Sequence, residues 1–173
     1  MPDRDSMAMD DLIRRADAWL RGNRPDYYAI LRPGASDAAL DAYAVRFGMA
    51  LPSELRQLYG WRDGQDLNIS NALVHNHMFM PLEQSASSKD QLDGMIGFDF
   101  DDPNWWRRGW VPFTLSYGGD HYCVDLDAEA GAAAGRVIGF WHDEARRPVR
   151  APSFATWFDQ LVITMEEGRL EVE

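Results

Sequence analysis

Apolar residues recur at helical spacing through the first sixty residues of the chain. Three segments show this pattern, and each follows a serine that can cap a helix: Ser6, Ser36 and Ser53. Their apolar faces consist of Met9, Leu12, Ile13, Ala16, Trp19 and Leu20 in the first segment, Leu40, Tyr43, Ala44 and Phe47 in the second, and Leu55, Leu58 and Tyr59 in the third. Gly22 and Gly48 suit the ends of the first two helices, because glycine readily adopts a left-handed conformation. The pattern therefore predicts three helices before residue 61.

The middle of the chain gives weaker signals. Residues 72–82 have enough apolar and aromatic content for a strand or an extended segment, although Pro81 makes its pairing uncertain. Residues 83–96 are compatible with a helix, which the serine-rich stretch 85–88 weakens. Residues 97–109 are expected to form a loop.

Three strands and a last helix follow. Residues 110–117 alternate and place Val111, Phe113 and Leu115 on one face; Gly118-Gly119 then predicts a hairpin turn. In the next strand Tyr122, Val124 and Leu126 lie opposite His121, Cys123 and Asp125. An Ala/Gly-rich loop over 127–135 leads to a third strand over 136–141. Ser153 can cap a final helix with Phe154, Trp157, Phe158, Leu161, Val162 and Met165 on its apolar face.

Helices, then strands, then a helix predict an α+β fold rather than alternating βαβ units. We expect the N-terminal helices and the C-terminal helix to pack on a central, mainly antiparallel sheet. A chain of 173 residues is long enough for one well-buried core, and it contains no internal repeat or linker. The prediction is a single domain over residues 1–173.

Charge narrows the class of partner. The chain has 28 acidic and 17 basic residues, a net charge of −11, and only one of the basic residues is a lysine, Lys89. Binding to nucleic acid needs clustered cations, so direct nucleic-acid binding is not expected. Residues 83–129 hold ten acids and three bases, and so carry −7 of the total. This acidity is either a solvated face or a docking surface for a basic protein.

Composition also bears on location. No window approaches the ~18 consecutive apolar residues of a membrane span. The first twenty residues carry five charged side chains by residue 11 and have no apolar core typical of a secretory signal. Cys123 is the only cysteine, so no internal disulfide can form. We expect a cytoplasmic protein that does not bind membranes, with Cys123 buried as a small apolar residue.

Residues with catalytic or metal-binding chemistry are few. His75 and His77 would share one strand face, which is half of a metal site, but no companion ligands with zinc spacing are evident. Asp99, Asp101 and Asp102 resemble a carboxylate cluster, yet they lie in a loop expected to be wet. Nucleophile-elbow, phosphate-loop and dinucleotide-binding motifs are absent from the sequence. We therefore expect no enzyme, no cofactor and no metal; a metal-dependent hydrolase is the least favoured alternative.

The pair Trp105-Trp106 is more informative. These tryptophans lie in the 97–109 loop between two aspartates and two arginines. At least one indole ring is expected to fold back onto the core, because tryptophan buries a large area. A ring left exposed beside acidic residues would be a good protein-binding hot spot.

Several short motifs in order resemble the SUKH superfamily of Smi/Knr-type proteins. They are Leu51-Pro52-Ser53-Glu54-Leu55 with Tyr59 and Gly64, Trp110-Val111-Pro112-Phe113, Gly118-Gly119-Asp120, Tyr122-Cys123-Val124-Asp125-Leu126, Gly135-Arg136-Val137-Ile138, and Ser153-Phe154 with Trp157-Phe158. The resemblance covers residues 33–161, with 1–32 as an N-terminal helical extension. Residues 83–109 resemble the family least.

The resemblance implies an α+β fold without known catalytic activity. Bacterial members of this superfamily are mostly inferred to be immunity proteins that neutralise toxins, often nucleases; fungal relatives regulate cell-wall synthesis. Since nucleases have basic substrate-binding surfaces, the acidic chain fits an immunity protein that binds a basic toxin domain. A regulatory scaffold of cell-wall or other cellular pathways is the alternative. The expected contact residues are Asp99, Asp101, Asp102, Trp105, Trp106 and Asp120.

Overall fold

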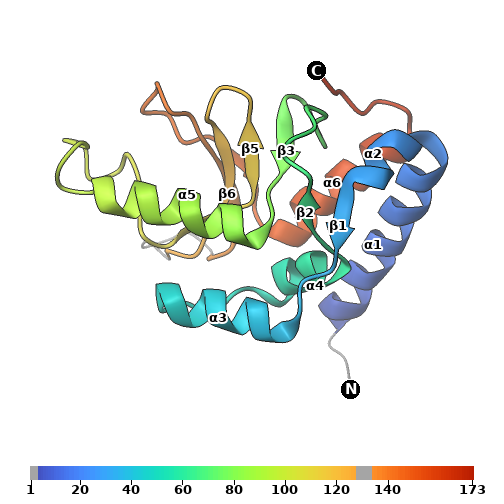
Figure 1. The fold of residues 1–173 in the computed structure, drawn as a ribbon, viewed down its shortest axis with the longest axis horizontal. Helices are drawn as coiled ribbons and strands as arrows, with labels where there is room; N and C mark the ends of the chain where they lie inside the picture. Colours follow the sequence, from blue (N-terminus) through green and yellow to red (C-terminus); the bar gives the residue numbers. More distant parts are fainter. Residues whose placement is uncertain (1–3, 128–133) are drawn as a thin grey trace.

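The computed structural model describes residues 4–127 and 134–173 (Figure 1). The helices are α1 (Arg4–Asn23), α2 (Pro25–Ile30), α3 (Asp37–Phe47), α4 (Ser53–Trp61), α5 (Leu82–Met95) and α6 (Phe154–Glu166). The strands are β1 (Leu31–Pro33), β2 (Arg62–Gln65), β3 (His77–Phe79), β4 (Trp110–Pro112), β5 (Thr114–Ser116), β6 (His121–Asp125), β7 (Arg136–Phe140) and β8 (Val149–Ala151). Most of the loop predicted over 127–135 lies outside the described residues. The predicted α+β class is confirmed.

Two of the four predicted serine caps are confirmed. The hydroxyl oxygens of Ser36 and Ser153 accept hydrogen bonds from the backbone N–H groups of Ala39 and Thr156, each at 3.1 Å. The other two predictions are wrong. Helix α1 begins at Arg4, so Ser6 lies inside it. Pro52 is the N-cap of α4, and Ser53 is its first helical residue.

The largest sheet has the order β4-β6-β7-β8, and all of its pairs are antiparallel. Two smaller antiparallel pairs, β1-β2 and β3-β5, complete the strands of the described chain. The predicted single strand over 110–117 is wrong, because it breaks at Phe113. Its first half, β4, pairs with β6, whereas its second half, β5, pairs with β3. The predicted hairpin is present: Ser116 N donates to Asp120 O at 2.8 Å, and Gly119 has a φ of 96°.

The sheet is covered on both faces, and alternation along β6 assigns residues to each side. Tyr122 and Val124 belong to a large core that also includes the apolar faces of α1, α4 and α6. Cys123 belongs to a smaller core with Trp106, Trp110, Ile138 and Phe140. Side chains of α5 and the following loop, including Leu92 and Trp105, pack against this second core. α5 and the loop that follows it are therefore held against one face of the sheet by this smaller core.

The N-terminal helix is part of the main core. It runs alongside α6 (Figure 1), where the Arg15 guanidinium makes two 2.8 Å hydrogen bonds to the carboxylate of Glu166. Its buried residues include Met9, Leu12, Ala16 and Leu20. Among the described helices, none is both long and apolar enough to cross a membrane.

Candidate functional site

A groove lies between α5, the loop that follows it, and the ends of β5, β6 and β7. We call it the α5 groove; its volume is about 360 Å³. Its apolar lining consists of Leu92, Met95, Phe100, Trp105, Leu115 and Phe140. Polar side chains of α5 and the imidazoles of His121 and His142 complete it. An apolar floor with a few polar groups is typical of a binding site.

Trp106 supports this groove from below. Its side chain is 1% exposed, and its indole packs edge-on against the rings of Trp110 and Phe140 at 5.4 and 5.2 Å. Its Nε1 donates a 2.8 Å hydrogen bond to Oδ1 of Asp93 on α5. The expectation that one tryptophan of the pair folds back is confirmed. Trp106, one of the predicted contact residues, is therefore buried in the smaller core, and its ring is not at the surface.

Lys89 holds α5 and the following loop together, a role that the sequence pattern does not predict. The ammonium is fully buried; it donates to Asp93 Oδ1 at 3.2 Å and to the backbone carbonyl of Arg108. It also lies 5.1 Å from the ring centroid of Phe47 and 5.9 Å from that of Trp106. Burial lowers the pKa of the ammonium, although the charge of Asp93 opposes this shift. One internal cation thus connects α5 to the loop.

Trp105 is half-buried at the edge of the groove, and Arg147 holds it there. The guanidinium lies 5.0 Å from the centroid of the Trp105 ring and 4.6 Å from that of Phe140. It also donates to the Trp105 carbonyl oxygen at 2.8 and 3.2 Å. A tryptophan fixed in advance loses little conformational freedom on binding, so its exposed edge suits a contact residue.

Three acidic side chains lie on the loop that forms one side of the groove. Asp99, Asp101 and Asp102 are exposed, and none forms an ion pair within the described parts of the chain. Other acids of the same acidic section are paired with cations: Glu83 with Arg32, Asp90 with Arg46, Asp93 with Lys89 and Asp125 with Arg136. On the same loop the side chain of Phe98 is 85% exposed. The loop therefore offers unpaired negative charge beside an exposed aromatic ring.

Asp120 contacts His142, which lines the α5 groove. Its Oδ1 accepts hydrogen bonds from the backbone N–H of His142 at 2.9 Å and contacts Nδ1 of that ring at 2.7 Å. Burial raises the pKa of Asp120, but the hydrogen bonds from His142 together outweigh it, so the pKa lies below its ordinary value. The same hydrogen bond raises the pKa of His142. With Asp143 these residues bring three ligand atoms within 4.8 Å, but two of the residues are exposed, and such groups are common without a metal.

The histidine pair predicted in the 75–77 segment does not share a strand face. His77 is buried in β3, with its Nδ1 2.8 Å from Oγ1 of Thr114 and its ring stacked on Tyr122. His75 precedes the strand, has a φ of 51°, and is partly exposed. The prediction of a common face was therefore wrong, because the backbone turns at His75. Cys123 is buried as predicted, and burial raises its pKa.

The profile of the SMI1/KNR4 family (SUKH-1) matches residues 34–160, more than half of the chain. The chain belongs to the SMI1/KNR4 family. The match includes the α5 groove and leaves α1, α2 and β1 outside it. The resemblance stated from the motifs is confirmed.

One relative of this SMI1/KNR4 chain is the cell wall biosynthesis/cell cycle regulator smi1 of Schizosaccharomyces pombe. The two are 24% identical over 189 aligned positions, which cover 92% of this chain and 36% of the relative. The chain thus spans about a third of the length of this relative.

Proposed function

We propose that this domain is a non-catalytic protein-binding module that uses the α5 groove and its acidic loop to bind a basic protein in the cytoplasm. The observation that carries the proposal is the combination of unpaired carboxylates with a fixed, half-exposed Trp105 at one apolar groove. Complementary charge accelerates association and selects the partner, whereas a buried aromatic anchor supplies affinity.

The contact surface we propose consists of Asp99, Asp101, Asp102, Trp105 and Asp120, with Trp106 beneath it as support. Asp101 and Asp102 are exposed and so would meet the partner first. Trp105 and His142 line the groove itself, and Asp120 contacts His142.

The partner we propose is a basic toxin domain, which the protein binds and neutralises. Net charge supports this: a toxin that acts on nucleic acid has a cationic surface, and a protein of charge −11 with a free acidic loop competes for it. A direct test is co-expression. A toxic domain encoded next to this gene should stop growth alone, and this chain should restore growth. Restoration should fail with Asp101→Lys/Asp102→Lys; rescue by that variant would contradict the proposed surface.

A second candidate is a regulatory scaffold. The name of the Schizosaccharomyces pombe relative, a cell wall biosynthesis/cell cycle regulator, favours it. The two candidates differ in the captured partner: a toxin domain favours the first, whereas a cell-wall or cell-cycle protein held by the same surface favours the second.

A further inference from the structure

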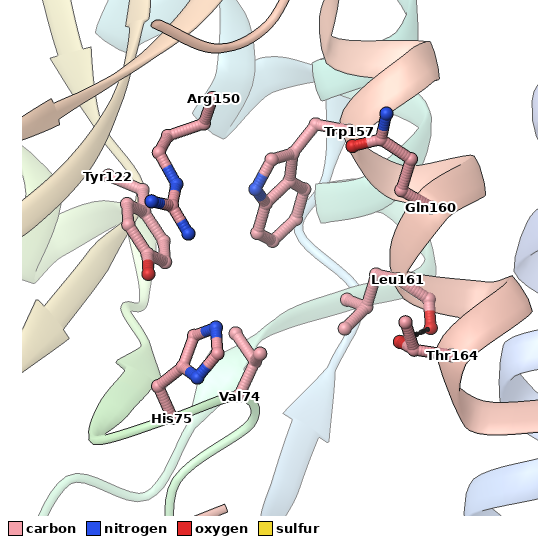
Figure 2. Close-up of a pocket in the computed structure, with 8 residues that line it drawn as sticks. All are labelled: Val74, His75, Tyr122, Arg150, Trp157, Gln160, Leu161 and Thr164. Carbon is pink, nitrogen blue, oxygen red and sulfur yellow. Dashed lines mark hydrogen bonds between the residues drawn. The ribbon is translucent and has the colours of Figure 1, made fainter. Parts of the chain in front are cut away.

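A second pocket, of about 220 Å³, lies between α6 and the sheet (Figure 2). Its wall includes Tyr122, which points to the face of β6 opposite His121 of the α5 groove. The residues that matter for its chemistry are His75, Tyr122, Arg150, Trp157, Gln160 and Leu161. A space of this size holds a group comparable to one amino-acid side chain.

Arg150 gives this pocket a positive charge. Its guanidinium lies 5.5 Å from the ring centroid of Tyr122, and Figure 2 shows it directed into the space between Tyr122, Trp157 and His75. Within the described residues no carboxylate pairs with Arg150, and no carboxylate lines the pocket. An acid lies at one end of the pocket: Oε2 of Glu171 is 3.5 Å from Nδ1 of His75. Arg150 is exposed, and its guanidinium, which has no carboxylate partner among the described residues, can donate charge-assisted hydrogen bonds to an anionic ligand.

One further donor without a protein partner among the described residues faces the same space. Trp157 is only 8% exposed, yet its indole N–H makes no hydrogen bond to any described residue, and Figure 2 shows this nitrogen on the side that faces Arg150. Gln160 also lines the pocket, but it is exposed, and Figure 2 shows its amide on the other side of the Trp157 ring from Arg150. The Trp157 N–H opens into the pocket and is free to donate to an acceptor bound there.

The pocket is formed before any ligand arrives. His75 adopts its left-handed conformation because the chain end holds it: its N–H donates to Glu171 O at 2.6 Å, and its carbonyl accepts from Glu173 N at 2.9 Å. The hydroxyl of Thr164 is satisfied by the Leu161 carbonyl at 2.7 Å, so it does not compete as a donor. The remaining walls are the Tyr122 ring, Val74 and Leu161, which are apolar surfaces.

We propose that this pocket binds a carboxylate attached to a small apolar group. Arg150 and the Trp157 N–H donate to the carboxylate oxygens, and the apolar group packs on Tyr122 and Leu161. Two sources share this chemistry: a free small carboxylic acid and the C-terminal residue of a peptide. The proposal is independent of the α5 groove, because the two sites lie on opposite faces of the sheet.

The test uses the full-length protein labelled with ¹⁵N and titrated with N-acetylphenylalanine, with its carboxamide analogue as the matched probe. Trp157→Phe identifies the indole signal of Trp157. We expect this signal to shift saturably with the acid and not with the amide. A peptide ending in phenylalanine with a free carboxylate then distinguishes the sources: tighter binding than the acid indicates a chain terminus, and weaker binding indicates a small molecule.

Arg150→Gln should weaken binding of the acid about tenfold, because a charge-assisted hydrogen-bond pair is lost. Arg14→Gln is the control, since Arg14 is an exposed arginine on α1 far in sequence from the pocket. Equal urea midpoints for the three proteins would show that folding is intact. A shift of equal size with acid and amide, no saturable shift, or unchanged affinity in Arg150→Gln would overturn the proposal.

Discussion

The ammonium of Lys89 and the indole N–H of Trp106 donate to the same oxygen, Oδ1 of Asp93, at 3.2 and 2.8 Å. Lys89 and Asp93 lie one turn apart on α5, whereas Trp106 lies on the loop behind the groove. A carboxylate shared in this way joins the helix to the loop. Trp105 immediately precedes Trp106 in the chain, so its position depends on this junction.

Lys89→Met should destabilise the protein by about 3 kcal/mol, because it removes one partner of a buried pair and leaves the Asp93 carboxylate without a cation. Methionine has a similar length, so the loss comes from charge rather than volume. Urea unfolding at pH 7 measures it. Adding Asp93→Asn, which keeps an acceptor for Trp106, should recover part of the loss.

A Lys89→Met protein within about 0.5 kcal/mol of the original would contradict this account of the junction, since changes of that size are typical of neutral surface substitutions. The same holds if Asp93→Asn added on top made the protein still less stable.

Arg147→Gln should loosen Trp105. The substitution removes a cation that lies over two rings and donates to the Trp105 carbonyl. We expect a stability loss of about 1 kcal/mol, from the cation–π contacts and the hydrogen bonds together. Faster amide exchange should be confined to the loop over 97–109. Arg146→Gln, at an exposed neighbouring arginine, is the control. If Arg146→Gln accelerated exchange in the 97–109 loop to the same degree, a specific role for Arg147 would be excluded.

Stability should fall as the pH falls below about 6.5, because His77 is buried and neutral in the folded protein. Burial lowers its pKa to about 3, whereas the unfolded chain takes up a proton near its ordinary value of about 6.5. Between these values the unfolded state binds more protons, so acid favours unfolding. Burial lowers the pKa of His121 in the same direction. For one such histidine, the difference in proton binding lowers the free energy of unfolding by about 2 kcal/mol between pH 6.5 and pH 5.

Urea midpoints at several pH values check this. His77→Gln should flatten the slope between pH 6.5 and pH 5, although it lowers stability at pH 7 through the lost stacking on Tyr122. An unchanged slope would show that His77 is not the titrating group.

Cys123 should resist thiol reagents in the folded protein. The side chain is fully buried in β6, and burial raises the pKa of its thiol, so little thiolate is present to react. Ellman's reagent should report no reaction in buffer and one thiol in denaturant. Fast reaction in buffer would mean that the smaller core opens readily.

The strongly periodic elements were predictable from the sequence. Helices α3 and α6 follow serine caps and apolar repeats, and α5 was recognised in spite of its serines. The break of the 110–117 strand was not predictable, because alternation continues through Phe113 and the break arises from pairing with two different partners. Pairing partners depend on distant segments, which local pattern does not report.

The site was predictable in part. Acidic, exposed residues of the loop and the burial of one tryptophan followed from composition and side-chain size. The positioning roles of Lys89, Arg147 and His142 did not, since each contacts residues distant in sequence or in another element. The single lysine among seventeen basic residues was the one available signal.

Capture of partners with charge-reversed variants tests the central claim most directly. Three proteins are immobilised and then incubated with an extract of native host cells. They are the original chain, the Asp101→Lys/Asp102→Lys variant, and a control with the same change in net charge, Asp26→Lys/Asp37→Lys. Asp26 and Asp37 are exposed on α2 and α3, which do not line the groove. Captured proteins are then quantified by mass spectrometry.

We predict a basic protein that the original chain and the Asp26/Asp37 control retain equally, and that Asp101→Lys/Asp102→Lys depletes about tenfold or more at low salt. Equal depletion by the control, or no basic protein that distinguishes the variants, would contradict binding through the α5 groove.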